Sequence, residues 1–242
     1  MIQISIVRLH EYRLWTRLLG YDREHIIQSI QARAYYILQK AFSKRNAFIH
    51  HLRYDYYIAI TNNIGIDEHR EIFHEVNGEL PTAIAISIAA DKHPLLACRK
   101  ATQILQKHRA PGIYMDSIAN GKVSFIHLDI VNSTKSFLER GLSAYEAYII
   151  MLQVTMTLHK IMELLNGLVF YLGGDNVLLT LSPSRELKKQ ALTIIHHLHD
   201  NHGVSARAGI GICDIPRKAL MLATKALEEA RENGREVIMY EE

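Results

Sequence analysis

Two aspartates in the second half of the chain are hard to explain as purely structural residues. Asp129 closes the apolar run SFIHLD, and Asp175 lies at the tip of the segment FYLGGDNVLL, which has the pattern of a hairpin. If the strand and the hairpin are neighbours in one sheet, the two carboxylates lie close together, which is unfavourable unless a cation lies between them. Mg²⁺ prefers carboxylate oxygens together with substrate phosphates. The pattern therefore predicts a magnesium site formed by Asp129 and Asp175.

The residues around these aspartates have the chemistry to hold a nucleotide. Gly173 and Gly174 supply the freedom of a tight turn and let a purine approach the backbone. The carbonyl oxygen of Ile130 could complete the metal shell, and the N–H groups after it, near a helix start, could hold phosphate oxygens. Two arginines near the end of the last helix suit a polyphosphate. The predicted nucleotide-binding residues are Gly173, Gly174, Asn176, Asn132, Ser133, Thr134, Arg231 and Arg235.

Each motif also has a structural interpretation. A Gly-Gly-Asp-Asn turn is good hairpin chemistry in any protein, and the two arginines could offset the negative end of a helix. Gly209 and Gly211 lack the third glycine of a dinucleotide fingerprint and lie in a strand pattern, so close packing explains them better. The histidines in HHLHDNH (196–202) are spread over different faces of a helix, which favours a polar helix end over a metal site.

The chain repeats one order of elements twice, as its hydrophobic periodicity indicates. The first pass predicts a strand at 3–9, a helix at 23–42, a hairpin at 47–61, a helix at 67–76, a strand at 82–89 and a helix at 94–108. The second predicts a strand at 122–130, a helix at 145–165, a hairpin at 168–181, a helix at 185–200, a strand at 206–213, a helix at 217–232 and a strand at 236–240. Within the helix at 145–165, a stripe at helical spacing is interpreted as core: Tyr145, Tyr148, Ile149, Leu152 and Met156.

The βαββαβ order is that of a ferredoxin-like sheet, mainly antiparallel and covered on one face by helices. We therefore expect an α+β protein of two such halves, residues 1–110 and 121–242, joined by a short connector at residues 107–121. Aligned at an offset of about 120 residues, the halves pair Asp55 with Asp175 and His10 with Asp129. Because His10 is not an acid and Tyr56 stands in place of Asn176, the first half is predicted to hold a degenerate metal site.

Composition excludes several classes of protein. With 48% hydrophobic and 22% charged residues, the chain is expected to fold rather than to be disordered. Its net charge of +3 is too small for a nucleic-acid footprint, so no nucleic acid is expected as partner. The apolar runs are strand-sized, which predicts no membrane span. The N-terminus has no signal-peptide pattern, and two cysteines without a metal or disulfide spacing suit reduced thiols. A cytoplasmic location is expected.

Several motifs together resemble a known family, the archaeal GTP cyclohydrolase III enzymes. They run through the whole chain in order: LHEYRLWTRLLGYDRE, LRYDYYIAITN, HLDI, YLGGDN and ARAGIGI. A more distant resemblance, to the GGDEF diguanylate cyclases and the nucleotidyl-cyclase palm, is limited to the second half, in HLDI, YLGGDN and ATKALEEARENGR.

The family resemblance implies a function and a set of roles. It implies magnesium-dependent hydrolysis of GTP to 2-amino-5-formylamino-6-(5-phosphoribosylamino)pyrimidin-4(3H)-one and two phosphates, an early step towards riboflavin- and F420-type cofactors. It implies a homo-oligomer, dimer or tetramer, with K⁺ as a candidate second cation. Asp129, Asp175 and Asp55 are the candidate catalytic residues, and Asp129, Ile130 and Asp175 the candidate metal ligands. Two alternatives remain open, a nucleotidyl or diguanylate cyclase and a non-catalytic GTP-sensing module.

Overall fold

The structure, a computed structural model, describes residues 1–131, 139 and 141–242. The chain forms two compact units. The first unit comprises Met1–Lys92, Leu96–Gly121 and Ile215–Arg217, and the second unit comprises His93–Leu95, Lys122–Asp214 and Lys218–Glu242. No helix in these described ranges is both long enough and apolar enough to cross a membrane.

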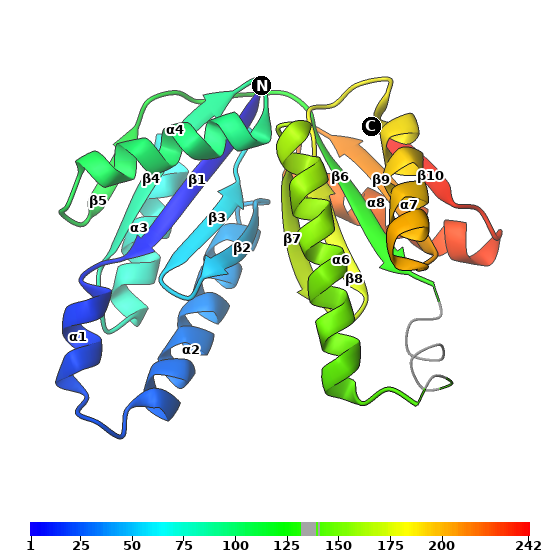
Figure 1. The fold of residues 1–242 in the computed structure, drawn as a ribbon. Helices are drawn as coiled ribbons and strands as arrows, with labels where there is room; N and C mark the ends of the chain where they lie inside the picture. The colour runs from blue at the N-terminus through cyan, green and yellow to red at the C-terminus, as the bar shows by residue number, and fades with distance from the viewer. Residues whose placement is uncertain (132–138, 140) are drawn as a thin grey trace. The chain divides into compact units, whose positions relative to one another are not determined.

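The first unit is a five-stranded sheet with the order β2-β3-β1-β4-β5, in which β5 runs parallel to β4 and the other neighbours are antiparallel (Figure 1). Its elements are β1 Ile2–Leu9, α1 Tyr12–Leu18, α2 Glu24–Ser43, β2 Phe48–Arg53, β3 Tyr56–Ile60, α3 Ile66–Glu79, β4 Ile84–Asp91, α4 Pro94–Lys107 and β5 Gly112–Met115.

The second unit repeats this topology with the order β10-β9-β6-β8-β7, and β10 is its parallel strand. Its elements are β6 Val123–Ile130, α6 Ala144–Leu164, β7 Leu168–Gly173, β8 Asn176–Thr180, α7 Leu187–His202, β9 Ala206–Cys213, α8 Pro216–Glu232 and β10 Val237–Glu241. The predicted α+β fold of two ferredoxin-like halves is confirmed, because the antiparallel order of the first four strands is that of the βαββαβ unit.

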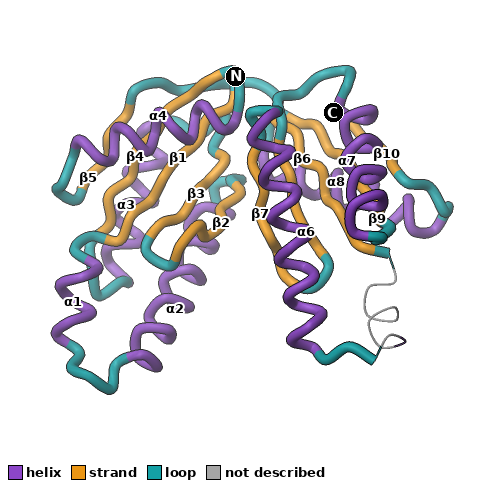
Figure 2. Tube along the Cα trace, viewed as in Figure 1, coloured by secondary structure: helices purple, strands orange, loops and turns teal. Residues whose placement is uncertain are grey.

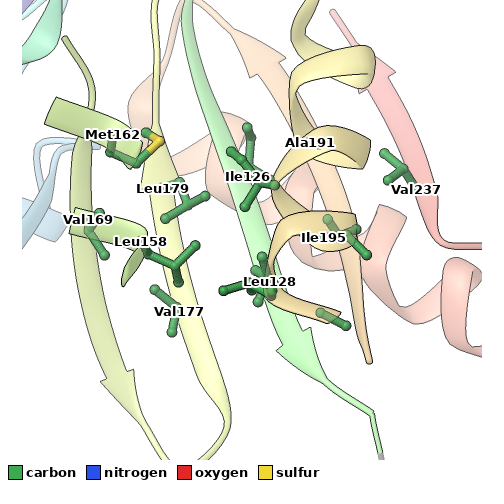
Figure 3. Packing of buried hydrophobic residues seen from close by; sticks show 14 of the residues in the cluster. Ile126, Leu128, Leu158, Met162, Val169, Val177, Leu179, Ala191, Ile195 and Val237 are labelled. Carbon is green, nitrogen blue, oxygen red and sulfur yellow. The ribbon is translucent and has the colours of Figure 1, made fainter. Parts of the chain in front are cut away.

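Helices cover both faces of each sheet, not one as expected (Figure 2). In the second unit Ile126 and Leu128 point into a core shared with α6 and α7, as Figure 3 shows. Alternate residues of a strand point to opposite faces, so His127 faces the other way and contacts Thr224 of α8. The alternation of polar and apolar residues is weak in the sequence of β6, because a strand covered on both faces carries apolar residues on both.

Helix α8 lies directly on β9, which explains two glycines. A Cβ atom at Gly209 would lie 2.1 Å from the carbonyl oxygen of Ala223, and one at Gly211 would lie 2.0 Å from that of Ala219. Any larger side chain would push the helix off the strand. Close packing therefore accounts for the AGIGI segment, as the sequence indicated.

Three further features of the structure differ from the sequence expectations. Helix α1 was missed, and the connector between the halves contains strand β5. The stripe on α6 is not core. The buried face of this helix is formed by a neighbouring stripe with the same spacing, Met151, Val154, Thr155, Leu158 and Met162. The stripe predicted to be core is instead 38–71% exposed: Tyr145, Tyr148, Ile149, Leu152 and Met156. Periodicity cannot choose between two apolar stripes on one helix.

Candidate functional site

The end of β6 lies beside the tip of the β7–β8 hairpin. Asp129 is directly opposite Asn176 in the antiparallel ladder, and the N–H of Ile130 donates to the carbonyl oxygen of Asp175 at 3.2 Å. Because the N–H and C=O of one residue in a strand point to the same side, the Ile130 carbonyl is also directed towards the hairpin. The ladder thus brings together the three residues that the sequence analysis named as metal ligands.

The hairpin tip is a turn that only glycine forms without strain. Gly173 has φ +107° and Gly174 has φ +60°, both in the left-handed region. No atom lies within 4 Å of a Cβ built at either position, so the requirement is conformational and not steric. The Tyr171 hydroxyl donates to the Gly174 carbonyl oxygen at 2.9 Å, which closes the turn before Asp175.

Arg231, in the last turn of α8, supplies positive charge to the site. Its Nη2 lies 2.8 Å from Oδ1 of Asp129, its Nε donates to Oδ2 at 3.3 Å, and its Nη1 lies 2.5 Å from Oε1 of Glu228. Hydrogen bonding to Asp129 raises the pKa of Arg231 above its ordinary value, with further contributions from the charges of Glu228 and Asp175. The guanidinium of Arg231 therefore offsets the negative charge of Asp129 and Glu228.

His127 is a site residue that the sequence analysis missed. It lies two positions before Asp129 on the same face of β6, and its imidazole contacts Asn176 Oδ1 at 3.1 Å and Thr224 Oγ1 at 3.2 Å. Burial lowers the pKa of His127, so the neutral ring is favoured. Period-two alternation back from Asp129 was the one signal that could have identified it.

The first unit corrects the predicted alignment of the halves. There the N–H of Leu9 donates to the Asp55 carbonyl oxygen at 3.0 Å, which is the counterpart of the bond from Ile130 to Asp175. Arg8 lies opposite Tyr56, as Asp129 lies opposite Asn176. The residue in the place of Asp129 is therefore Arg8 and not His10. The sequence alignment paired the halves by similar residue types, whereas the strand register shows which residues occupy equivalent positions in the two sheets.

The remaining predicted residues lie in different surroundings. The Asp55 carboxylate accepts hydrogen bonds from Arg53, from Nε at 3.0 Å and from Nη2 at 2.7 Å, and its catalytic role stays a prediction. Arg235 follows Gly234 beyond the end of α8, where its side chain is exposed. The predicted phosphate cradle Asn132, Ser133 and Thr134 lies outside the described residues.

The donor set at the end of β6 fits a small hard cation. Two carboxylates and a main-chain carbonyl oxygen are available, and hard oxygen ligands suit Mg²⁺. Across the described part of the chain, no group of three or more His, Cys, Asp or Glu side chains is arranged to hold a metal ion by itself. A Mg²⁺ ion held by one or two carboxylates usually takes its remaining ligands from waters and substrate phosphates.

Comparison with known proteins places the chain in a family. The model of GTP cyclohydrolase III matches residues 2–239. The GTP cyclohydrolase III of Methanothermobacter thermautotrophicus is 31% identical over 240 residues, covering 96% of this chain and 95% of that protein. That of Pyrobaculum islandicum is 33% identical over 238 residues, covering 97% of each.

Solved structures match more weakly. A GGDEF domain from Pseudomonas aeruginosa is 21% identical and covers 50% of this chain and 84% of that chain, with a TM-score of 0.43. A bacterial light-regulated adenylyl cyclase is 12% identical and covers 99% of this chain and 85% of that chain, also with a TM-score of 0.43. The sequence matches, which span nearly all of the chain, show that it belongs to the GTP cyclohydrolase III family.

Proposed function

We propose that this chain hydrolyses GTP in the presence of Mg²⁺, opening the imidazole ring and releasing the two terminal phosphates. The product would be 2-amino-5-formylamino-6-(5-phosphoribosylamino)pyrimidin-4(3H)-one, which retains the formyl group. Family membership supports the reaction, and the relatives carry the name of this enzyme. The observation that carries the site is the placement of Asp129 beside Asp175 across the strand ladder at the end of β6, with Arg231 paired to Asp129.

The two aspartates and the Ile130 carbonyl would hold the magnesium ion, and K⁺ stays a candidate second cation. When bound, the divalent ion neutralises phosphate charge and lowers the pKa of a bound water. The chain's own residues have two tasks. Asp129 and Asp175 fix the direction from which the phosphates approach, because their backbones are tied together across the ladder. The left-handed turn at Gly173 and Gly174 keeps side chains out of the approach of the nucleotide.

Arg231 would change partners when the substrate binds. Its guanidinium is held by Asp129 and Glu228 and is about one-third exposed, so it can reach the entering phosphates without breaking the core. A planar guanidinium binds phosphate oxygens in the same two-pronged way as it binds a carboxylate. Glu228 lies three residues before Arg231 on the same helix, and its hydrogen bond to Nη1 would keep Arg231 at the site during this exchange.

The rival enzyme is a nucleotidyl or diguanylate cyclase, which would use the same metal site but keep the purine intact. The two reactions are separated by incubating the purified chain with GTP and Mg²⁺, with and without K⁺, and recording the ultraviolet spectrum of the product. We expect loss of purine absorbance together with phosphate release. A cyclic nucleotide with an intact purine would contradict the proposal, and GTP binding without turnover would favour the sensing module.

A matched pair of variants tests the site itself. Asp175→Asn removes the charge of one proposed ligand, and we expect phosphate release to stop while the circular dichroism spectrum is unchanged. Asp67→Asn makes the same chemical change at an 82% exposed carboxylate in α3, which pairs with Arg70, and should keep full activity. Near-normal turnover in Asp175→Asn would remove the metal assignment.

We also propose that the chain forms a homo-oligomer and resides in the cytoplasm. The exposed apolar stripe on α6, defined above, supports assembly, because contiguous apolar surface commonly marks protein contacts. The thiols of Cys98 and Cys213 are not joined in a disulfide, which fits a reducing compartment. Sedimentation velocity tests the first point, and a monomer at micromolar concentration would contradict it.

A further inference from the structure

The orientation of the Asp175 carboxylate is set by a neighbouring amide. Asn176 Nδ2 donates to Oδ1 of Asp175 at 2.8 Å. A carboxylate only accepts hydrogen bonds, so the NH₂ group of Asn176 must face Asp175 and its Oδ1 must face the other way. That oxygen is the atom that lies 3.1 Å from Nε2 of His127.

The amide is held in turn by the His127 ring, whose tautomer follows from its partners. An amide oxygen accepts, so Nε2 of His127 carries the proton. In the neutral ring Nδ1 is then an acceptor, and the Thr224 hydroxyl donates to it at 3.2 Å. The contacts form one directed series from Thr224 through His127 and Asn176 to Asp175, anchored at one end in α8 and at the other in the hairpin tip.

The fold does not require a histidine at this position. The register that pairs Arg8 with Asp129 also pairs Ile6 with His127, since both lie two residues earlier in their strands. Ile6 is 1% exposed and fills its place with an apolar side chain. In the first unit the counterparts of Asp129 and Asn176 are Arg8 and Tyr56. The histidine thus occurs together with the aspartate and the asparagine, and in the unit without them an isoleucine suffices.

We propose that His127 is a positioning residue, which holds the Asp175 carboxylate through Asn176 in the orientation that a metal–nucleotide complex needs. This inference rests on the proposed function. Loss of a direct hydrogen-bond partner of a metal ligand typically weakens metal binding about 10- to 100-fold. His127 lies one contact further back, behind Asn176, so His127→Leu is expected to weaken binding by about 10-fold, the lower end of this range. His127→Gln should largely restore binding, because its amide N–H replaces the donor at Nε2.

The test measures binding and not turnover. Full-length protein is titrated with Mn²⁺, a paramagnetic substitute for Mg²⁺, in the presence of a non-hydrolysable GTP analogue, and free Mn²⁺ is read by electron paramagnetic resonance. His69→Leu is the matched control. His69 is fully buried in the first unit and contacts Ser5 Oγ at 2.8 Å and the Gly65 carbonyl oxygen at 2.6 Å, so its loss should lower stability but not Mn²⁺ affinity.

The outcomes separate this inference from the proposed function. If wild-type protein does not bind Mn²⁺ with the analogue, the proposed metal site fails. If wild-type, His127→Leu and His127→Gln bind equally well and Asp175→Asn does not, the inference alone fails. Nitrogen-15 NMR of the His127 ring gives an independent readout on unmutated protein, even if the leucine variant does not fold. We expect the Nε2–H tautomer, and the Nδ1–H tautomer would overturn the proposal.

Discussion

The two units place the same strand order and pairing around opposite charges. In the second unit the strand-end side chain is Asp129, which pairs with Arg231 from the last turn of α8. In the first unit it is Arg8, whose Nη1 donates to the Leu105 carbonyl oxygen at 3.2 Å and whose Nη2 donates to that of His108 at 2.9 Å. Both contacts join the end of the unit's first strand to the end of its last helix, α4 in the first unit and α8 in the second. In the first unit the guanidinium satisfies the helix carbonyls directly, which is favourable at the negative end of a helix.

On the proposed function, the first unit keeps the strand pairing of the second without the carboxylate that would hold a metal ion. A cation cannot share the place of Arg8, because the guanidinium already provides the positive charge there. Asp55 is likewise balanced by Arg53, the residue in the place of Gly173. These two arginines give a physical reason why the first half would not bind a metal ion. That the first half holds a degenerate metal site stays a prediction.

The largest expected effect comes from moving the first unit's residue into the second. Asp129→Arg would place a second guanidinium beside Arg231 and remove a proposed metal ligand. We expect phosphate release to fall by at least about 100-fold, measured with a phosphate assay under saturating Mg²⁺. The reverse change, Arg8→Asp, should reduce stability and leave phosphate release in place. Equal losses of activity in both variants would show that the comparison of the units is wrong.

A smaller effect is expected at Arg231, whose guanidinium pairs with Asp129 and Glu228. Arg231→Met keeps much of the side-chain length but removes the charge that we assign to the phosphates. We expect GTP affinity to fall about 10- to 100-fold, with KM rising more than kcat falls. Measurements at several GTP concentrations separate the two constants. If kcat falls alone, Arg231 acts on the reacting atoms and not on substrate binding.

The units should also differ in their response to acid. Burial, with a smaller contribution from the charge of His51, lowers the pKa of His50 in β2 from 6.5 to about 4. Between these values the unfolded chain binds a proton that the folded chain excludes, so the free energy of unfolding decreases as pH falls through this window. The second unit has Phe170 in the same place.

His50→Phe should therefore remove roughly 3 kcal/mol of the stability difference between pH 7 and pH 4. Urea unfolding at both values, followed by circular dichroism, measures it. Phe170→His is the reciprocal control and should introduce acid sensitivity into the second unit. An unchanged pH difference in His50→Phe would mean that this ring is protonated in the folded protein.

Much of the fold could be predicted because its signals are local and repeated. The strand at 206–213 and the hairpin around Asp175 follow from hydrophobic alternation and turn residues. Because the order of elements is repeated, each element of one half is also supported by its counterpart in the other half. The predicted family and enzyme class are confirmed by the match over residues 2–239, since motifs spread along the chain carry that information. What failed depends on pairing between distant segments, such as Arg8 with Tyr56 and the choice of the buried stripe on α6.

The site was partly accessible to sequence analysis for the same reason. Asp129 and Asp175 stand out because acids interrupt apolar or turn patterns, whereas His127 has no pattern of its own. Its role follows from three contacts that join β6, β8 and α8, and the sequence does not specify such contacts. The roles of the site residues and of Mg²⁺ stay predictions.

The smallest predicted effect concerns the hairpin tips, where Gly173 and Arg53 occupy the same place. Gly173 has φ +107°, which an alanine adopts only with strain, although no atom lies within 4 Å of its Cβ. Gly173→Ala should therefore cost about 1 kcal/mol in urea unfolding. Gly78→Ala is the matched control, because Gly78 lies in α3 with open space and no positive φ. There alanine should stabilise the protein by about 0.5–1 kcal/mol. If both changes stabilise the protein, the turn before Asp175 does not need glycine. The presence of arginine at position 53 of the first unit would then not indicate that the two hairpin tips differ in backbone conformation.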